Sequence, residues 1–204
     1  MDSAEIRIIS TSYTMDADEP VVEIFGKARD GRSATVLVHG FRPYLFGVEV
    51  PKELEERLKA DSEVVSTVHE TLLYRGRDVD ALRITIRSPW KVPDFRNLLR
   101  RNGIESLASD IPFNHRYVYD MDMGACIRVE GEPVDKGYLT DITLSMTRFE
   151  NIEPFDPGLR ILSFDIENSV EHEFLYCICA VVWDKGAMRA CEPIYGKEDQ
   201  IIQS

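Results

Sequence analysis

Two carboxylates spaced two residues apart are the side chains of this sequence best suited to chemistry. In the segment 160–168, RILSFDIEN, apolar and polar residues alternate, which is typical of a β-strand. Asp165 and Glu167 then project from one face, roughly 6.5–7 Å apart along the strand. Carboxylates this close repel each other unless a cation neutralises them, and hard oxygen ligands suit Mg²⁺ or Mn²⁺. Two such ions could activate water for phosphodiester hydrolysis, although a solvated strand face is the commoner meaning of Asp-x-Glu.

A basic stretch is the second feature with chemical meaning. Residues 83–118 hold seven Lys or Arg against three Asp or Glu, a local charge of +4, while the whole chain carries −12. The acidic total argues against a general nucleic-acid binder, but a basic patch within it can still follow a phosphate backbone. Chance clustering on solvated helix faces explains the charge equally well, so the stretch gains meaning only from the loops it contains.

The composition bounds the class of protein. With 204 residues, of which 44% are hydrophobic and 29% charged, the chain can fold as one large domain or two small ones. No apolar run approaches the roughly 20 residues of a membrane span, and the start MDSAEIRIIS lacks signal-peptide character. Four cysteines without a secretory signal fit a reducing compartment. We therefore expect a cytoplasmic protein with no membrane partner.

Strands must dominate the first third of the chain. Residues 5–14, 21–28 and 33–40 are rich in β-branched side chains, with the turn-forming pair Asp30-Gly31 before the third segment. Residues 44–110 then alternate strand and helix patterns in the order βαββαβ, the ferredoxin-like plan shared by RNA-recognition modules. The aromatic motif of those modules is missing from the central strands, so nucleic-acid chemistry is expected in the loops.

A second domain is expected after a linker. Residues 125–149 read as further strands, and the Pro- and acid-rich segment 151–158 marks a boundary. Consecutive strands follow over residues 160–195. The sequence thus predicts an α+β protein. Residues 1–150 form a β-rich N-terminal domain containing the ferredoxin-like unit, and residues 151–204 begin a second domain.

Four short motifs in order resemble family B DNA polymerases. L-S-F-D-I-E at 162–167 resembles the first exonuclease motif of that family. Three earlier strings resemble the archaeal members in particular: F-R-P-Y at 41–44, P-W-K-V-P at 89–93 and D-I-P-F-N-H-R-Y at 110–117. The resemblance spans most of the chain and implies the N-terminal region of such a polymerase, followed by the first strands of a ribonuclease H-like 3′–5′ exonuclease domain.

The resemblance assigns roles to the carboxylates. Asp165 and Glu167 would be catalytic ligands of the Mg²⁺ or Mn²⁺ ions in the proofreading site. Asn168 departs from the small hydroxyl residue usual at its position, and the later exonuclease motifs are not in this sequence. The full-length protein would then be a DNA-directed DNA polymerase with 3′–5′ exonuclease activity, and this chain alone would be inactive.

In the archaeal members, the matching loops capture uracil in the template strand ahead of the replication fork. Val92, Pro43 and Phe113 are candidate walls that exclude the thymine methyl group, and Arg116 is the expected phosphate contact. Ordinary packing of loop residues is the competing interpretation. The residues expected to bind template and uracil are Tyr13, Pro43, Tyr44, Pro89, Val92, Ile111, Phe113 and Arg116.

The implied partners are template single-stranded DNA and primer–template DNA, with a sliding clamp for the full-length protein. Two alternatives remain open at this point. One is a stand-alone metal-dependent nuclease that relies on Asp165 and Glu167. The other is a small DNA-binding subunit of a split polymerase.

Overall fold

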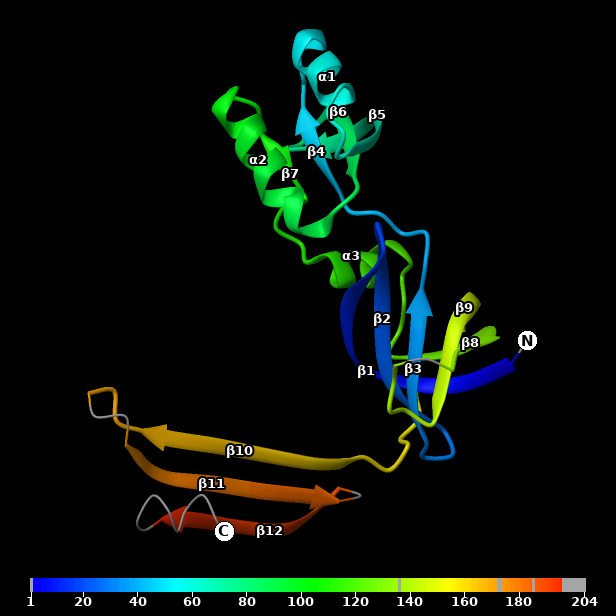
Figure 1. The fold of residues 1–204 in the computed structure, drawn as a ribbon, viewed down its shortest axis with the longest axis vertical. Helices are drawn as coiled ribbons and strands as arrows, with labels where there is room; N and C mark the ends of the chain where they lie inside the picture. The colour runs from blue at the N-terminus through cyan, green and yellow to red at the C-terminus, as the bar shows by residue number, and fades with distance from the viewer. Residues whose placement is uncertain (1, 136, 172–173, 185, 196–204) are drawn as a thin grey trace. The chain divides into compact units, whose positions relative to one another are not determined.

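The computed structural model describes residues 2–135, 137–171, 174–184 and 186–195. The chain divides into two units, Met1–Phe155 and Asp156–Ser204. Within the described residues, the first unit contains a five-stranded barrel, a four-stranded sheet and three α-helices, and the second contains a three-stranded sheet (Figure 1). The chain is therefore rich in β-structure, as the sequence predicted.

A closed barrel joins strands from the two ends of the first unit. Its strands are β1 (Asp2–Asp16), β2 (Glu19–Ala28), β3 (Ser33–Val38), β8 (Cys126–Pro133) and β9 (Ile142–Asn151). The order around the barrel is β1-β2-β3-β9-β8. β3 and β9 pair in parallel, with Ala34 opposite Ile142, and the other neighbours are antiparallel. This is the strand order of an OB-fold barrel. The sequence predicted the strands but not this closure.

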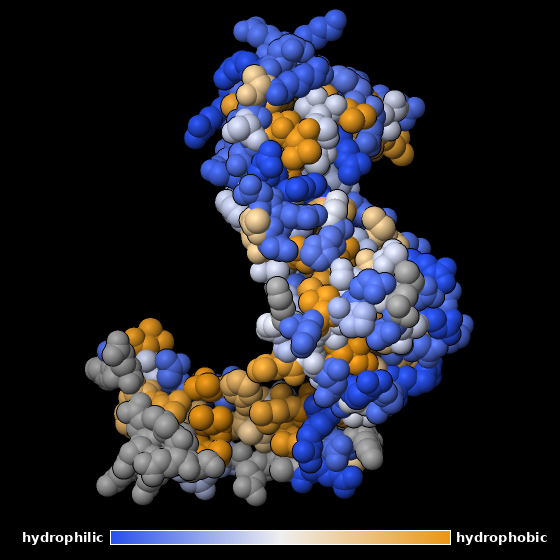
Figure 2. Space-filling model, turned by 45° about the vertical axis from the view of Figure 1, so that its right-hand side comes forward, coloured by the Kyte–Doolittle hydropathy of each residue, from blue (hydrophilic) through white to orange (hydrophobic). Residues whose placement is uncertain are grey.

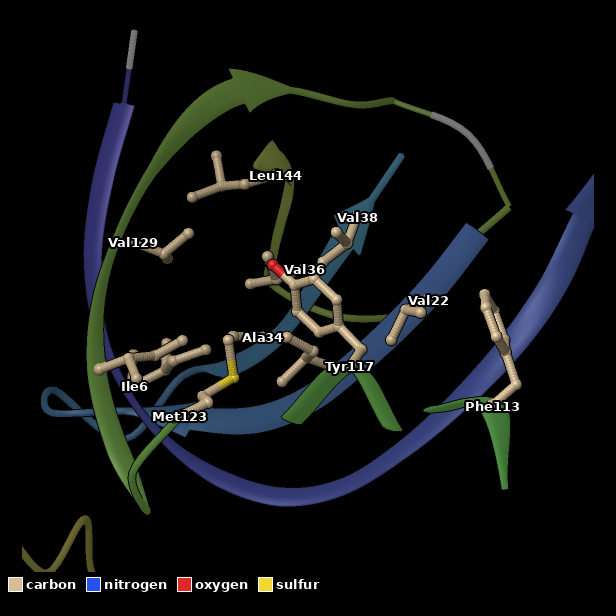
Figure 3. Close-up of a cluster of buried hydrophobic side chains, with 13 residues drawn as sticks. Ile6, Val22, Ala34, Val36, Val38, Phe113, Tyr117, Met123, Val129 and Leu144 are labelled. Atoms are coloured by element: carbon tan, nitrogen blue, oxygen red, sulfur yellow. The ribbon is translucent and has the colours of Figure 1, made fainter. Parts of the chain in front are cut away.

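The helix α3 (Phe113–Asp120) closes one end of the barrel. Figure 3 shows Tyr117 reaching into the barrel toward Val36 and Ala34, while Phe113 lies nearer its edge. Tyr117 is 4% exposed, and burial raises its pKa to about 12 because an apolar surrounding disfavours the phenolate. Asn114 ties the same helix to β1, since its Nδ2 donates to the Thr11 carbonyl oxygen at 2.8 Å.

The four-stranded sheet is inserted in the chain between β3 and α3. Its elements are β4 (Tyr44–Val48), α1 (Lys52–Lys59), β5 (Val64–Tyr74), β6 (Arg77–Ile86), the 3-10 turn η1 (Pro89–Lys91), α2 (Val92–Arg101) and β7 (Ser106–Leu107). The strand order is β5-β6-β4-β7, with antiparallel neighbours. The predicted βαββαβ order is confirmed, although β7 is shorter than the expected 104–110.

Local sequence explains why these elements begin and end where they do. Pro51 stands at the N-cap of α1, and the acids of its first turn face the positive end of the helix dipole. Gly103, with φ of 72°, follows α2, a conformation that glycine adopts without strain. Arg75 and Gly76 both have positive φ, as a two-residue hairpin turn between β5 and β6 requires.

One apolar core lies between this sheet and its two helices. Fully burying each aliphatic side chain there contributes about 1.5–3 kcal/mol. On the edge of the core, His69 of β5 lies 2.9 Å from Asp80 of β6 and 3.2 Å from Glu55 of α1. The buried members are Leu45, Val50, Leu54, Leu58, Leu82, Ile84, Ile86, Phe95 and Leu99.

The second unit is an antiparallel sheet with exposed apolar side chains. Its strands are β10 (Arg160–Asn168), β11 (Leu175–Asp184) and β12 (Ala187–Tyr195), in that order. Every residue of β10 is exposed, including Leu162 and Phe164 at 61% each. Figure 2 shows orange, apolar surface over this sheet. None of the helices in the described ranges has the length and apolar character needed to cross a membrane.

Candidate functional site

A pocket of about 310 Å³ lies in the first unit between the barrel and the four-stranded sheet. Its volume is at the small end of ligand sites. The structure brings all eight residues that were predicted to bind template and uracil together around it. The lining residues are Tyr13, Pro43, Tyr44, Pro89, Val92, Pro93, Arg96, Ser109, Asp110, Ile111, Pro112, Phe113 and Arg116.

Four separate segments build the pocket, and the two connections between the barrel and the four-stranded sheet are among them. Residues 39–43 lead from the barrel into the sheet, and residues 108–112 lead back to the barrel. Pro43 is fixed through its carbonyl oxygen, which accepts a hydrogen bond from the Ile86 N–H at 2.9 Å. Buried Pro89 and the turn η1 add the third segment, and β1 supplies Tyr13. Prolines in three of the segments restrict their backbones.

Tyr44 is the centre of a polar cluster under the pocket. Its hydroxyl donates to Asp120 Oδ2 at 2.7 Å, and its ring lies beneath two guanidinium groups, with Arg83 Cζ at 3.9 Å and Arg116 Cζ at 4.6 Å from the ring centroid. Burial, followed by the hydrogen bond to the Asp120 carboxylate, raises the pKa of Tyr44. The side chain therefore remains neutral at physiological pH and ties the start of β4 to α3.

Arg116 does not occupy the position that the sequence suggested. We expected it to contact a phosphate, but it is only 7% exposed. Its guanidinium donates to the Ala108 carbonyl oxygen and to the Tyr44 hydroxyl, the latter at 3.4 Å. A charged group with these partners stabilises the loop before α3 and has little surface left for DNA. We therefore assign Arg116 to the architecture of the pocket.

Aromatic rings form the barrel side of the pocket. Tyr13 meets Phe113 edge to face, with ring centroids 5.4 Å apart. Phe113 in turn stacks on Phe41 at 5.4 Å. Tyr13 remains 37% exposed, whereas Phe113 is 7% exposed. Tyr13 is thus the ring that an entering ligand can touch, and Phe113 holds it in place.

The loop before α3 lines the pocket and carries backbone donors that have no partner within the described structure. No hydrogen bond among the described residues uses the N–H of Asp110, Ile111 or Phe113. The N–H of Phe113 belongs to the first turn of α3, where helical donors lack an internal partner. The pocket thus combines apolar walls with several unpaired donors on one side, which suits a planar ligand that carries carbonyl acceptors.

Sequence reasoning missed part of the lining. Arg96 is four residues after Val92 on α2, so helical spacing could have placed it beside that residue. Pro93 and Pro112 lie within the quoted motifs but were not singled out. Asp110 likewise begins the quoted motif at 110–117, whereas Ser109 carries no local signal for a pocket, because only the fold decides which side of its loop faces the pocket.

The comparisons with known proteins bear on this site. No protein-family model matches the chain. DNA polymerase 2 of Aeropyrum pernix is 30% identical over 185 residues, covering 79% of this chain and 22% of that protein. The DNA polymerase of Archaeoglobus fulgidus is 28% identical over 178 residues, covering 82% of this chain and 22% of that protein.

A solved structure of a family B DNA polymerase has the same fold as this chain. The family B DNA polymerase from the hyperthermophilic archaeon Pyrobaculum calidifontis superposes with a TM-score of 0.73 and 20% identity, over 98% of this chain and 28% of that one. The chain matches the N-terminal region of archaeal family B DNA polymerases. It spans about a fifth of the length of the curated polymerases it matches, 22% in the two cases above.

The carboxylates that resemble the first exonuclease motif of the family B polymerases lie on β10. Asp165 and Glu167 stand opposite Cys179 and Cys177 of β11. Burial raises the pKa of Cys177, and the neighbouring thiol and both carboxylates add to the rise. Nowhere in the described parts of the chain do three or more His, Cys, Asp or Glu side chains come close enough to hold a metal ion. Two exposed carboxylates alone do not make a metal site, so no catalytic step can be derived from them here.

Proposed function

We propose that this chain is the template-binding N-terminal portion of a family B DNA polymerase, and that its pocket binds uracil in single-stranded template DNA. The observation that carries the proposal is the convergence of eight predicted residues from four segments on one pocket. The similarity to polymerases from archaea supports the wider assignment. The polymerase activity itself belongs to a protein several times longer than this chain.

The donors of the pocket favour uracil over cytosine. Deamination of cytosine replaces an amino donor with a carbonyl acceptor. The unpaired N–H groups of Asp110 and Ile111 can donate to that carbonyl, but would face an amino group in cytosine. An unsatisfied buried donor costs about 1–3 kcal/mol, which corresponds to an affinity ratio of about 5 to 150.

The walls of the pocket favour uracil over thymine. Thymine has the same hydrogen-bonding edge and adds one methyl group, so only close contact can exclude it. Val92 is packed against the core under α2, and Pro43 is held by the hydrogen bond to Ile86. Neither can retreat without disturbing its own packing, and overpacking of this kind costs about 1–3 kcal/mol.

Binding of matched oligonucleotides tests this proposal. The chain is titrated with fluorescent single strands that differ in one base, either uracil, thymine or cytosine. The uracil strand should bind most tightly, and Val92→Gln should abolish the preference by filling the pocket. Val68→Gln, at an exposed valine of β5, is the matched control and should keep it. Equal affinity for all three strands in the unmutated chain at low salt would remove uracil recognition from the proposal.

An intrinsic reporter gives a second measurement. Trp90 is 54% exposed and follows the pocket residue Pro89 in η1. The other tryptophan, Trp183, lies in the second unit, so Trp183→Phe leaves a single reporter. Its fluorescence should change on binding the uracil strand and much less on binding the thymine strand.

The resemblance to family B DNA polymerases also suggests roles for the other elements of the chain. The four-stranded sheet with α1 and α2 would be its ferredoxin-like unit, and β10–β12 the first strands of its ribonuclease H-like exonuclease domain. Asp165 and Glu167 would contribute to a Mg²⁺ or Mn²⁺ site completed by residues outside this chain. Primer–template DNA, a sliding clamp and a cytoplasmic location would belong to the full-length protein.

The stand-alone nuclease is the second candidate, and the exposed carboxylate pair is the only observation that favours it. Incubation of the chain with single-stranded DNA and Mg²⁺ or Mn²⁺ should leave the DNA intact. Digestion that disappears in Asp165→Ala would establish the nuclease instead. Such a result would leave the uracil pocket untouched, because the two sites lie in different units.

A further inference from the structure

The outward face of α2 carries arginines without acidic partners. Arg96 lines the pocket, and Arg100 follows one helical turn later on the same face. Arg100 and Arg101 line a shallow hollow with Asn97. Among the described residues, none of these three arginines forms an ion pair or a side-chain hydrogen bond. The basic side chains therefore continue from the edge of the pocket to the end of the helix.

Four other cations in or near the pocket are already engaged. Arg116 is buried under the loop before α3. Lys91 pairs with Asp94 at 3.1 Å, and Arg83 lies over the Tyr44 ring. Arg42 donates to the Asp18 carbonyl oxygen at 2.9 Å. Among the residues that line the pocket, Arg96 therefore keeps a guanidinium free for a phosphate.

The side of α2 opposite Arg96 is mainly acidic. Asp94 and Leu98 line another hollow together with Asp61, Glu63 and Lys91, and Lys91 is already paired with Asp94. A polyanion lying on α2 is repelled from that side and attracted by the other. The charges thus favour one basic path along α2, which starts beside the pocket at Arg96 and continues to Arg100 and Arg101. We call this path the lane.

We propose that α2 guides the DNA strand as it leaves the pocket, with consecutive phosphates bound by Arg96, Arg100 and Arg101. This inference rests on the proposed binding of template DNA and adds its direction. The strand is held on one side of the captured base only, because no comparable row of free arginines continues from the pocket elsewhere in the described structure.

Basic residues in a last helical turn have another explanation, which the test must separate. Arg100 and Arg101 occupy the last turn of α2, where positive charge stabilises the helix dipole. Arg96 lies outside that turn, so the dipole does not account for it. A role in the dipole would affect the stability of the fold, whereas a role in guiding DNA would affect binding.

The experiment uses two series of single strands, each with one uracil. In one series the strand is lengthened only on the 5′ side of the uracil, and in the other only on the 3′ side. We expect affinity to rise with length in one series and not in the other. The double variant Arg100→Gln/Arg101→Gln should remove that rise. It should also lower the salt slope of binding for the long strand by about 1.4, since each phosphate contact with single strands contributes about 0.7.

Arg57→Gln is the matched control, because Arg57 is an exposed basic residue in the last turn of α1. It should leave the length dependence and the salt slope unchanged. A rise of equal size in both series, or one that persists in the double variant, would overturn the proposal. So would a double variant that lowers the unfolding temperature but binds DNA as before.

The experiments distinguish failure of the uracil-binding proposal from failure of the proposal that α2 guides the strand. The ratio of uracil to thymine affinity measures the pocket and should be unchanged in the double variant. Loss of uracil preference in the unmutated chain, with one-sided length dependence still removed by the double variant, would refute the pocket and support the lane.

Discussion

Replacing Arg116 by Met separates a structural role from DNA contact. The change removes the charge and keeps an unbranched apolar side chain of similar reach. It eliminates the hydrogen bond to the Ala108 carbonyl oxygen, which is worth about 1.5–3 kcal/mol for a charged donor. It also removes the guanidinium 4.6 Å from the centroid of the Tyr44 ring, a contact of about 0.5–2 kcal/mol.

Relief of a desolvated charge offsets part of this loss. The net expectation is therefore a decrease of about 1–3 kcal/mol in the free energy of unfolding of the first unit. For a unit of this size, that decrease lowers the unfolding temperature by about 3–10 °C. Thermal unfolding followed by circular dichroism measures it directly.

The salt dependence of binding to single-stranded DNA gives the second half of the test. Arg116→Met should leave the salt slope unchanged, because a buried side chain releases no counterion. Arg96→Met should behave in the opposite way, with an unchanged unfolding temperature and a slope reduced by about 0.7. An Arg116 variant that is fully stable yet loses about 0.7 in slope would refute our interpretation and restore Arg116 as a phosphate contact.

Three further outcomes are expected. Tyr44→Phe should lower the free energy of unfolding by about 1 kcal/mol in chemical denaturation, because it removes one buried hydroxyl and its hydrogen bonds. His69 has a raised pKa, first through its hydrogen bond to Asp80, so the stability it contributes is complete below about pH 6.5. That contribution is lost as the pH rises through the raised pKa, and His69→Gln should flatten this part of a stability–pH profile. Gly131→Ala would place a Cβ 2.2 Å from the Ser145 carbonyl oxygen and should destabilise the barrel by about 1–3 kcal/mol in the same denaturation assay.

Local patterns were sufficient to predict most of the strands and helices. Strand and helix patterns over residues 44–110 predicted β5 and β6, and the turn-prone run Arg75-Gly76-Arg77-Asp78 predicted the turn between them, which the structure narrows to Arg75 and Gly76. Closure of the barrel could not be predicted in this way. Ala34 of β3 pairs with Ile142 of β9, more than a hundred residues later, and no local propensity selects a partner at that separation.

The site shows the same division. Motifs that resemble a family indicated which loops to bring together, and the structure places those loops around one pocket. The motifs did not reveal which side chains are buried. Arg116 stands in a basic stretch and next to an aromatic residue, as a DNA contact would, yet tertiary packing turns its guanidinium inward to Ala108.

The two connections between the barrel and the inserted sheet, residues 39–43 and 108–112, are also walls of the pocket. The pocket therefore lies at the hinge between the barrel and the inserted sheet. A ligand that contacts Tyr13 of the barrel and Val92 of the inserted sheet's helix α2 would bridge this hinge and resist rotation of the barrel against the sheet. Capture of a single base would then reduce the motion of the barrel relative to the inserted sheet.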